Sequence, residues 1–287
     1  SMSDYLIIGG GQAAASLAEK LRALGAEGSV TIVGDEPVPP YERPPLSKAY
    51  LMGAIAKERL FLRPGAIYAE KDITLRLGAR ATAIDPVGKT VDVSVQHVSY
   101  GKLALVTGSS PIRLPAAIGG DLDGVYTVRT LADIDAMSPL FQSGARVLVV
   151  GGGYIGLEAA AVAAKLGLQV TLVEQAPRIL GRVAAEETAD VIRDAHRAYG
   201  VEIVEGVGRK ELSGGDHVST AHLSDGRSLE VDFVIVGIGI RPESALAEGA
   251  GLTIDNGIAV DTYGRTSVPN IWAAGDCASF PYRGTRL

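Results

Sequence analysis

Two glycine-rich turns of the same design occur in this chain, each between an apolar strand-like run and an alanine-rich helical run. The first spans residues 9–14 (GGGQAA) and the second spans residues 151–156 (GGGYIG). Glycines at this spacing let the backbone approach a pyrophosphate, and the unpaired N–H groups of the following helix then face it. A single turn of this kind also occurs where nothing binds, but two in full strand–turn–helix–strand context predict two dinucleotide sites.

The sequence around the first turn supports this interpretation. Residues 5–8 form the strand that enters the turn, a helix is expected over 12–24, and residues 30–33 supply the next parallel strand. The acids Asp35 and Glu36 follow that strand. This is the order expected of a βαβ unit that binds a dinucleotide.

The second turn has the same surroundings and a complete glycine pattern. Residues 146–150 enter it, a helix is expected over 154–165, and the strand over 170–173 ends on Glu174. A carboxylate about 20 residues beyond such a turn holds an adenosine ribose. It accepts hydrogen bonds from a free 2′-hydroxyl and repels a 2′-phosphate, so NADH is expected rather than NADPH. Arg178 and Arg182 would weaken this preference if they folded back onto the ribose.

Composition excludes several other classes of protein. The chain has 287 residues, of which 47% are hydrophobic and 21% charged, as in a well-buried chain with room for two domains. The net charge is −6 without a block of Lys or Arg, so neither nucleic acid nor an anionic membrane is an expected partner. The apolar stretch 147–164 includes glycines and Glu158, which indicates buried core rather than a membrane span. No signal segment precedes the first strand, and we expect a cytoplasmic protein.

Cysteine and histidine usage argues against a metal or a disulfide. Cys277 is the only cysteine, so no disulfide, Cys-x-x-Cys pair or Cys₄ site is available, and a packing role is expected for it. The four histidines lack the spacing of metal ligands. We therefore predict no metal site.

The rest of the chain divides into recognisable segments. The proline-dense loop 37–48 is expected to be rigid and extended, and its cations either contact a cofactor or are simply solvated. Residues 103–111 indicate a buried strand ending in a turn. An amphipathic helix is expected over 185–199, and turn signals at 213–216 and 224–227 predict a small antiparallel meander.

Several of these segments together resemble the flavin-dependent ferredoxin reductases of bacterial oxygenase systems, which include putidaredoxin and rubredoxin reductases. The resemblance covers essentially the whole chain, and the pairing of RPPLSK with AAGD is its most specific part. The segments that carry it are GGGQAA, ERPPLSK, LVTGSSP, GGGYIGLE and NIWAAGDCA.

This resemblance implies an α/β fold with two Rossmann-like domains, in which an NAD domain is inserted into a discontinuous FAD domain. Residues 1–115 and 242–287 would bind FAD, and residues 116–241 would bind NADH. The residues implied in binding FAD are Gly9, Gly11, Ala14, Asp35, Glu36, Arg43, Lys48, Thr107, Gly108 and Asp276.

The resemblance also implies a set of residues for the nicotinamide nucleotide. Gly151, Gly153 and Gly156 would receive the pyrophosphate of NADH, and Glu174 its ribose. Lys48, Glu158 and Tyr154 would be the catalytic residues beside the flavin and the nicotinamide, and Glu158 would pair with Lys48, unless that pair is only structural. Gly239, after the strand expected over 231–236, completes the nucleotide-contacting set.

The implied activity is hydride transfer from NADH to FAD, followed by single-electron transfer to a ferredoxin-type iron–sulfur protein. No Cys lies in the loop 43–48, so the disulfide reductase and thiol-dependent branches of the wider superfamily are disfavoured. An NADH oxidase, another small-molecule reductase, or a nucleotide-binding redox module with little turnover are the alternatives. The sequence does not indicate the oligomeric state.

The chain departs from the family pattern in several places. Residues 100–103 (YGKL) replace the usual Y-D-x-L, and Val106 replaces an Ala. Ser110 stands where relatives often have Arg, so one FAD contact fewer is expected. Relatives also continue beyond the GDCA segment, so we expect a truncated chain.

Overall fold

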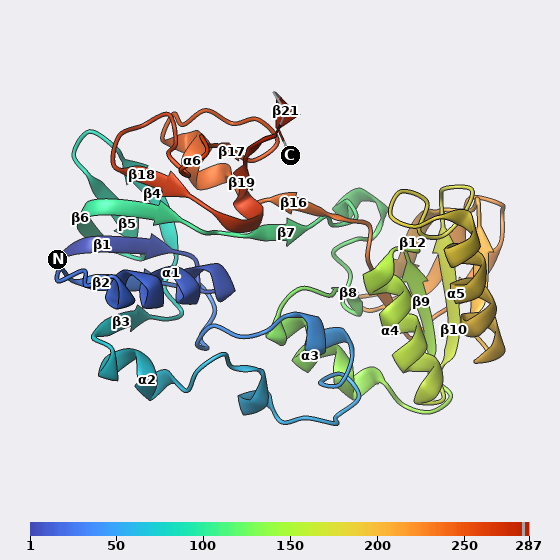
Figure 1. Ribbon diagram of the computed structural model, residues 1–287. Helices are drawn as coiled ribbons and strands as arrows, with labels where there is room; N and C mark the ends of the chain where they lie inside the picture. Colours follow the sequence, from blue (N-terminus) through green and yellow to red (C-terminus); the bar gives the residue numbers. More distant parts are fainter. Residues whose placement is uncertain (283–284, 287) are drawn as a thin grey trace. The chain divides into compact units, whose positions relative to one another are not determined.

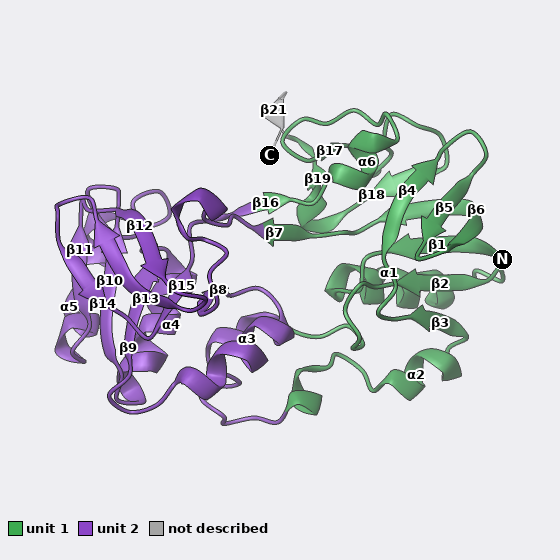
Figure 2. Cartoon of the chain, turned by 180° about the vertical axis from the view of Figure 1, so that it is seen from behind, with its two compact units in different colours: residues 1–42, 57–110, 241–287 green, residues 43–56, 111–240 purple. Residues whose placement is uncertain are grey.

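The computed structural model describes residues 1–282 and 285–286, and these form two compact units (Figure 2). Unit 1 consists of residues 1–42, 57–110 and 241–287, and unit 2 consists of residues 43–56 and 111–240. The chain passes between the units four times, and two of these crossings lie in β7 (Ser109–Pro111) and β16 (Ile240–Pro242), which form a two-stranded sheet. Unit 1 is therefore discontinuous in sequence, as a domain carrying an insertion must be.

Unit 1 is built on a seven-stranded sheet with the order β3-β2-β1-β6-β5-β4, in which β18 also pairs with β6 (Figure 1). Strand β5 pairs with the first part of β6, and β18 pairs with its last part. The strands that pair in parallel are β1 (Met2–Ile8), β2 (Val30–Val33), β3 (Ile73–Arg76), β6 (Gln96–Leu105) and β18 (Ile271–Ala273). The antiparallel strands are β4 (Ala81–Asp85) and β5 (Thr90–Val93).

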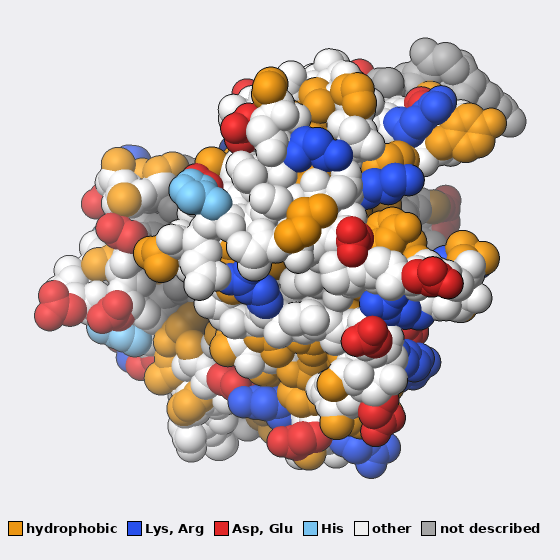
Figure 3. Space-filling view, turned by 90° about the vertical axis from the view of Figure 1, so that its left-hand side faces the viewer, with side chains coloured by type: hydrophobic (Ala, Val, Ile, Leu, Met, Phe, Trp, Pro, Cys, Tyr) orange, Lys and Arg blue, Asp and Glu red, His pale blue; other side chains and the backbone are white. Residues whose placement is uncertain are grey.

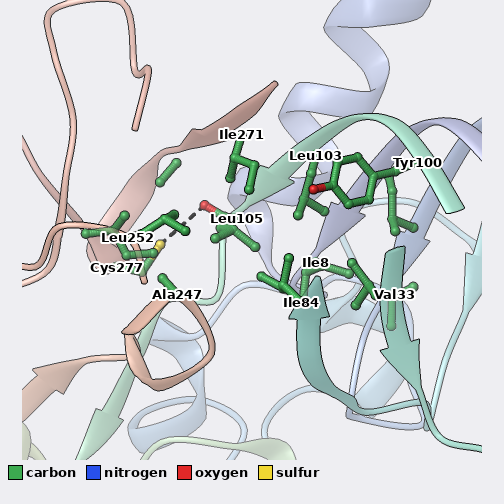
Figure 4. Packing of buried hydrophobic residues seen from close by; sticks show 14 of the residues in the cluster. Ile8, Val33, Ile84, Tyr100, Leu103, Leu105, Ala247, Leu252, Ile271 and Cys277 are labelled. Carbon is green, nitrogen blue, oxygen red and sulfur yellow. Dashed lines mark hydrogen bonds between the residues drawn. The ribbon is translucent and has the colours of Figure 1, made fainter. Parts of the chain in front are cut away.

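The two faces of this sheet bury two different hydrophobic clusters, because successive side chains of a strand point to opposite faces. Ile7 of β1 packs in one cluster with α1 (Gln12–Ala23) and α2 (Gly65–Glu70). Leu6 and Ile8 pack in the other, together with α6 (Ala245–Gly249). The second cluster includes Leu103, Leu105, Ile271 and Cys277 (Figure 4).

Unit 2 contains a five-stranded sheet of the order β11-β10-β9-β15-β8 in which every pair is parallel. Helix α4 packs on strands β9 and β10 and also contacts α5. The antiparallel meander packs on the sheet through a shared hydrophobic cluster that includes Leu148 of β9 and Leu212 of β12. The sheet strands are β8 (Val125–Thr127), β9 (Arg146–Val150), β10 (Gln169–Glu174), β11 (Glu202–Glu205) and β15 (Phe233–Val236). The other elements are α3 (Leu131–Met137), α4 (Tyr154–Lys165), α5 (Glu186–Ala198), β12 (Arg209–Gly214), β13 (Val218–Leu223) and β14 (Ser228–Glu230).

Short elements complete the chain. The 3₁₀ helices are η1 (Pro44–Ser47), η2 (Lys57–Leu60), η3 (Ala116–Ile118), η4 (Ser138–Leu140) and η5 (Gly275–Cys277). The remaining strands pair as β17 (Ile258–Ala259) with β19 (Ala278–Ser279) and as β20 (Pro281–Tyr282) with β21 (Thr285–Arg286).

Most of the predicted elements are confirmed, and the proline-dense loop is the exception. The helix predicted over 154–165 is α4, that over 185–199 is α5, and the meander is β12–β14. The expected extended course of loop 37–48 is wrong at Pro44–Ser47, which form a 3₁₀ helix. Both prolines occupy its first positions, where a fixed φ suits a helix and no N–H is required.

The units differ from the predicted cofactor domains at their edges. Contacts divide the chain after residues 110 and 240, and they group the segment 43–56 with unit 2. Residues 283, 284 and 287 of the predicted FAD segment lie outside the described residues. This division rests on contacts within the chain and does not assign a cofactor to either unit, so the FAD and NAD domains stay a prediction.

The face of the molecule shown in Figure 3 carries acidic and basic side chains interspersed with one another. Such a mixed surface gives little long-range attraction to a partner of either charge. Among the described residues, no helix has both the length and the apolar character required to cross a membrane.

Candidate functional site

Apart from Arg43 and Lys48, which belong to unit 2, the predicted FAD residues gather along one edge of the unit 1 sheet, where its parallel strands end. Residues 9–11 follow β1, residues 35–36 follow β2, and residues 107–108 follow β6. Asp276 follows β18, which lies beside β6. Since parallel strands end at a common edge, four segments distant in sequence meet there, and this edge is where open α/β sheets bind ligands.

The first glycine turn has the geometry of a phosphate cradle. Gly9 has φ of 128°, and a Cβ there would lie 2.1 Å from the carbonyl oxygen of Val106. Gly11 is the N-cap of α1 without a side-chain cap, and a Cβ added to it would meet no protein atom within 4 Å. The first turn of α1 contains no acid. The turn thus leaves open space and the positive end of a helix together.

The segment that contains Asp276 packs against this same helix. The N–H of Ala274 donates to Leu105 O at 3.1 Å, and a Cβ on Gly275 would lie 3.4 Å from the Cβ of Ala13. Asp276 is exposed on the following 3₁₀ helix. An exposed carboxylate therefore lies close to the start of α1.

A polar cluster fixes the strand end after β6. The hydroxyl of Thr107 donates to the carbonyl oxygen of Glu243 at 2.6 Å, and the N–H of Glu243 donates to Gly108 O at 2.8 Å. Ser110 donates to the carboxylate of Glu243. Sequence reasoning missed Glu243, because no pattern links it to a residue more than 130 positions earlier.

The two acids after β2 have different surroundings. Glu36 Oε1 accepts a hydrogen bond of 2.6 Å from the hydroxyl of the buried residue Tyr41. Asp35, in contrast, is exposed. Ala14, in the first turn of α1, is fully buried and packs in the cluster between that helix and the sheet, and its predicted role at the FAD pyrophosphate stays a prediction.

Arg43 lies in the segment that groups with unit 2. One of its terminal nitrogens, Nη1, donates to the backbone carbonyl of Arg129 at 2.7 Å. Its predicted contact with the FAD phosphate stays a prediction.

The second glycine turn repeats the cradle at the carboxyl edge of the unit 2 sheet. A Cβ on Gly151 (φ 110°) would lie 2.0 Å from Gly237 O, and a Cβ on Gly156 would lie 2.1 Å from Gly151 O. Gly153 is the uncapped N-cap of α4, and the space around its missing Cβ is open within 4 Å. Two glycines thus permit close packing within the protein, and one leaves room for a ligand.

The start of α5 provides a contrast within unit 2. Its first turn carries Glu186 and Glu187, which stabilise the positive end of the helix dipole. Helices α1 and α4 are of similar length but have no acid in the first turn. Unlike α5, the two helices that follow glycine turns therefore leave the positive end of the helix dipole available to a bound anion.

Glu174 ends β10 beside the second turn, with its carboxylate held in place. Its Oε1 accepts the N–H of Gly152 at 3.0 Å, and its Oε2 accepts the N–H of Ala176 at 2.8 Å. A carboxylate has about four acceptor sites, so it can still receive hydroxyl groups of a ribose. Arg178 donates to backbone carbonyls of its own loop rather than to this carboxylate. Arg182 is exposed.

The three predicted catalytic residues lie within unit 2. Lys48 Nζ is 3.2 Å from Glu158 Oε1, and the buried hydroxyl of Ser47 donates to Glu158 Oε2 at 2.7 Å. Tyr154 opens α4 with 49% of its surface exposed. The pair between Lys48 and Glu158 is confirmed as a contact, and its catalytic role stays a prediction. Sequence reasoning quoted Ser47 only as part of a motif and missed its contact.

Gly239 follows β15, the strand beside β9. It has φ of 114°, it is exposed, and a Cβ on it would lie 3.4 Å from the Ile112 side chain. An L-residue would be strained at this φ, so the backbone conformation of the loop after β15 depends on glycine.

Cys277 is fully buried, and its sulfur lies 3.3 Å from the carbonyl oxygens of Leu105 and Ala274 (Figure 4). Its place in the core agrees with the expected packing role. Over residues 1–282 and 285–286, no group of three or more metal-ligating side chains occurs.

The residues present fit a dinucleotide at each sheet edge. Each edge has a glycine whose Cβ position is open, an uncapped helix N-terminus without an acid, and a carboxylate after a neighbouring strand. FAD would be held at the unit 1 edge and a nicotinamide nucleotide at the unit 2 edge.

Comparisons with known proteins agree with this geometry. A family model described as pyridine nucleotide-disulphide oxidoreductase matches residues 3–286. The chain is 44% identical, over 98% of its length and 68% of the relative's, to the 5,5'-dehydrodivanillate O-demethylase ferredoxin reductase subunit of a Sphingobium species. It is 42% identical, over 96% of its length and 67% of the relative's, to putidaredoxin reductase of Pseudomonas putida.

Solved structures show the same relationship. The chain superimposes on the reductase in the covalent complex of putidaredoxin reductase with putidaredoxin, with a TM-score of 0.95 and 38% identity. The match covers 99% of this chain and 70% of that one. The fold is thus an α/β fold with two Rossmann-like sheets.

Proposed function

The chain belongs to the pyridine nucleotide-disulphide oxidoreductase family, within the group of ferredoxin, putidaredoxin and rubredoxin reductases, and from this we propose a function. It is an NADH-dependent, FAD-containing reductase that delivers single electrons to a ferredoxin-type iron–sulfur protein serving an oxygenase. FAD supplies the chemistry when bound, because it accepts an electron pair as hydride and releases electrons singly.

The observation that carries this proposal is the pair of cradles. Gly11 and Gly153 each leave open space at an uncapped helix N-terminus. A protein that bound one dinucleotide as substrate would need one cradle, and two are needed when one dinucleotide reduces another. Backbone N–H groups of α1 would hold the pyrophosphate of FAD, and those of α4 would hold that of NADH.

NADH is favoured over NADPH by the arrangement around Glu174. The carboxylate is fixed by two backbone N–H groups and retains acceptor sites for a 2′-hydroxyl. A 2′-phosphate at the same place would be repelled by it. Arg178 does not offset that repulsion, since its guanidinium is engaged with carbonyls of its own loop.

Lys48 and Glu158 are proposed to orient the reacting rings, with Tyr154 beside them. Ser47 fixes one carboxylate oxygen of Glu158, so the other oxygen faces the ammonium group of Lys48. The side chain of Lys48 is 57% exposed, so it is accessible to a ligand. The absence of cysteine in the loop 43–48 argues against a thiol relay and supports direct electron delivery to an external acceptor.

The test is an absorption spectrum of the purified protein under anaerobic conditions, before and after stoichiometric NADH and in parallel with NADPH. A flavin band that bleaches with NADH and hardly with NADPH is the expected result. Added ferredoxin should then accelerate NADH oxidation far above the rate with oxygen alone. Rapid turnover with oxygen without an effect of ferredoxin would instead indicate an NADH oxidase, and a colourless protein that binds NADH would indicate a binding module.

A further inference from the structure

Beyond the residues that would touch the nucleotide, we infer that Glu205 and Arg193 act as a positioning pair for the ribose end of the NADH site. The pair would strengthen NADH binding and maintain discrimination against NADPH. This inference rests on the proposed function, because it takes Glu174 as the ribose acceptor. Glu205 ends β11, and in the sheet it lies directly beside Glu174 at the end of β10.

The ion pair between Arg193 and Glu205 is bidentate and mostly buried. Arg193 donates from Nε to Glu205 Oε1 at 2.8 Å and from Nη2 to Oε2 at 2.7 Å. Its Nη1 donates to Asp190 at 2.7 Å. The side chains are 13% and 17% exposed. A fork of this kind fixes the direction of both groups more firmly than a single contact at the surface.

Glu205 is anionic at neutral pH in spite of its burial. Burial by itself raises the pKa of the carboxyl, but hydrogen bonds from Arg193 and from the N–H of Ile179 more than offset this and leave the pKa below its ordinary value. The carboxylate is therefore a permanent acceptor for the Ile179 N–H, at 2.9 Å.

That hydrogen bond fixes the loop that follows Glu174. The next N–H, of Leu180, donates to Gly152 O at 2.9 Å, and the N–H of Gly206 donates to Ala176 O at 2.8 Å. Leu180 has φ of 55°, a strained conformation for a non-glycine residue that persists only where surrounding contacts impose it. The contact through Ile179 is one of those contacts.

The loop in turn sets the position of the ribose acceptor. Ala176 donates to one oxygen of Glu174, and Gly152 donates to the other while accepting from Leu180. Movement of the loop would therefore move the acceptor and the glycine turn together. The same fixed loop keeps Arg178 on the carbonyls of residues 179, 180 and 184, away from a 2′-phosphate.

The test compares Glu205→Gln with Asp232→Asn in the full chain supplied with FAD. Asp232 also accepts both an arginine fork, from Arg146, and a backbone N–H, but it lies at the opposite edge of the same sheet. Anaerobic fluorescence titration gives Kd for NADH and NADPH, with the flavin already reduced by dithionite so that no hydride is transferred, and thermal unfolding checks that each variant folds. E205Q should raise Kd for NADH about tenfold, or about 1.4 kcal/mol, because a charge-assisted hydrogen bond is weakened.

The 2′-phosphate of NADPH cannot donate a hydrogen bond to Glu174, so Kd for NADPH should change less in E205Q than Kd for NADH. The ratio of the NADPH constant to the NADH constant should therefore decrease. D232N should leave both constants within about twofold of wild type, as expected for a substitution away from the site. Arg193→Lys, which keeps the charge but not the fork, should shift Kd for NADH less than Arg193→Gln. In steady state, KM for NADH should rise in E205Q while kcat stays unchanged.

Equal shifts in E205Q and D232N, or an unchanged ratio of NADPH to NADH constants in E205Q, would overturn the inference and leave the proposed function standing. Failure of the wild-type chain to bind NADH would overturn both.

Discussion

Gly11 and Gly153, whose Cβ positions are open at the starts of α1 and α4, provide a direct test of which unit binds which cofactor. We predict that Gly11→Ala loses affinity for FAD and keeps that for NADH, and that Gly153→Ala does the reverse. Both residues have negative φ, −97° and −82°, so alanine adopts their conformation without strain. Neither new methyl group would meet a protein atom within 4 Å.

The expected magnitudes separate binding from folding. Replacing glycine by alanine reduces the entropy of the unfolded chain, which stabilises the protein by about 0.4–1 kcal/mol. Alanine is also a poorer N-cap than glycine, which destabilises the helix by a similar amount. The free energy of unfolding should therefore stay within about 1 kcal/mol of wild type. A methyl group placed against a pyrophosphate should cost about 1–3 kcal/mol, as extra groups do in packed sites, which corresponds to a roughly 5- to 150-fold weaker Kd.

The assay is a titration of each variant with FAD and NADH separately, together with chemical denaturation. Gly156→Ala is the matched control, since its methyl group would lie 2.1 Å from a backbone oxygen inside the protein and should destabilise unit 2 itself. Wild-type affinity of G153A for NADH would refute the reasoning, because it would show that no pyrophosphate approaches that glycine.

Three further outcomes are expected. Glu158→Gln removes the anion 3.2 Å from Lys48. Because the Lys48 side chain is 57% exposed, this loss should cost under about 1 kcal/mol of stability. Anaerobic flavin reduction by NADH, followed by stopped flow, should slow by about tenfold or more, and an unchanged rate would mean that the pair is only structural. Cys277→Ala should cost about 1 kcal/mol in urea denaturation and leave turnover unchanged; lost turnover would contradict its packing role. The pKa of Glu205 is lowered from its ordinary value of 4.5, so its contribution to stability is complete above pH 4.5 and is lost as the pH falls through the lower folded-state value. The stability of E205Q should therefore fall less than that of wild type over this acid range. Identical acid-unfolding profiles of the two proteins would show that Glu205 makes no such contribution.

The parts of the fold that follow local patterns could be predicted from the sequence. The strand, glycine turn and helix at residues 146–165 are signalled by residues adjacent in the chain, and the structure reproduces them. The prediction for the loop at 37–48 went wrong because proline fixes φ but not ψ, and the backbone at Pro44 turned into a 3₁₀ helix.

Contacts between distant residues were beyond such patterns. Lys48 and Glu158 were paired only through a family resemblance, since nothing local relates two residues 110 positions apart. Arg193 and Glu205 were not recognised at all, because a helix and a strand must fold before their charges meet. Grouping of the segment 43–56 with unit 2 likewise depends on tertiary contacts.

The late return of the chain to unit 1 has a consequence for its synthesis on the ribosome. Strand β6 ends at Leu105, but its partner β18 ends only at Ala273. At about 5–20 residues per second, the nascent chain waits on the order of ten to thirty seconds for that partner. During this interval residues 111–240 of unit 2 emerge, while the second half of β6 has an unpaired apolar edge to which other nascent chains and chaperones have access.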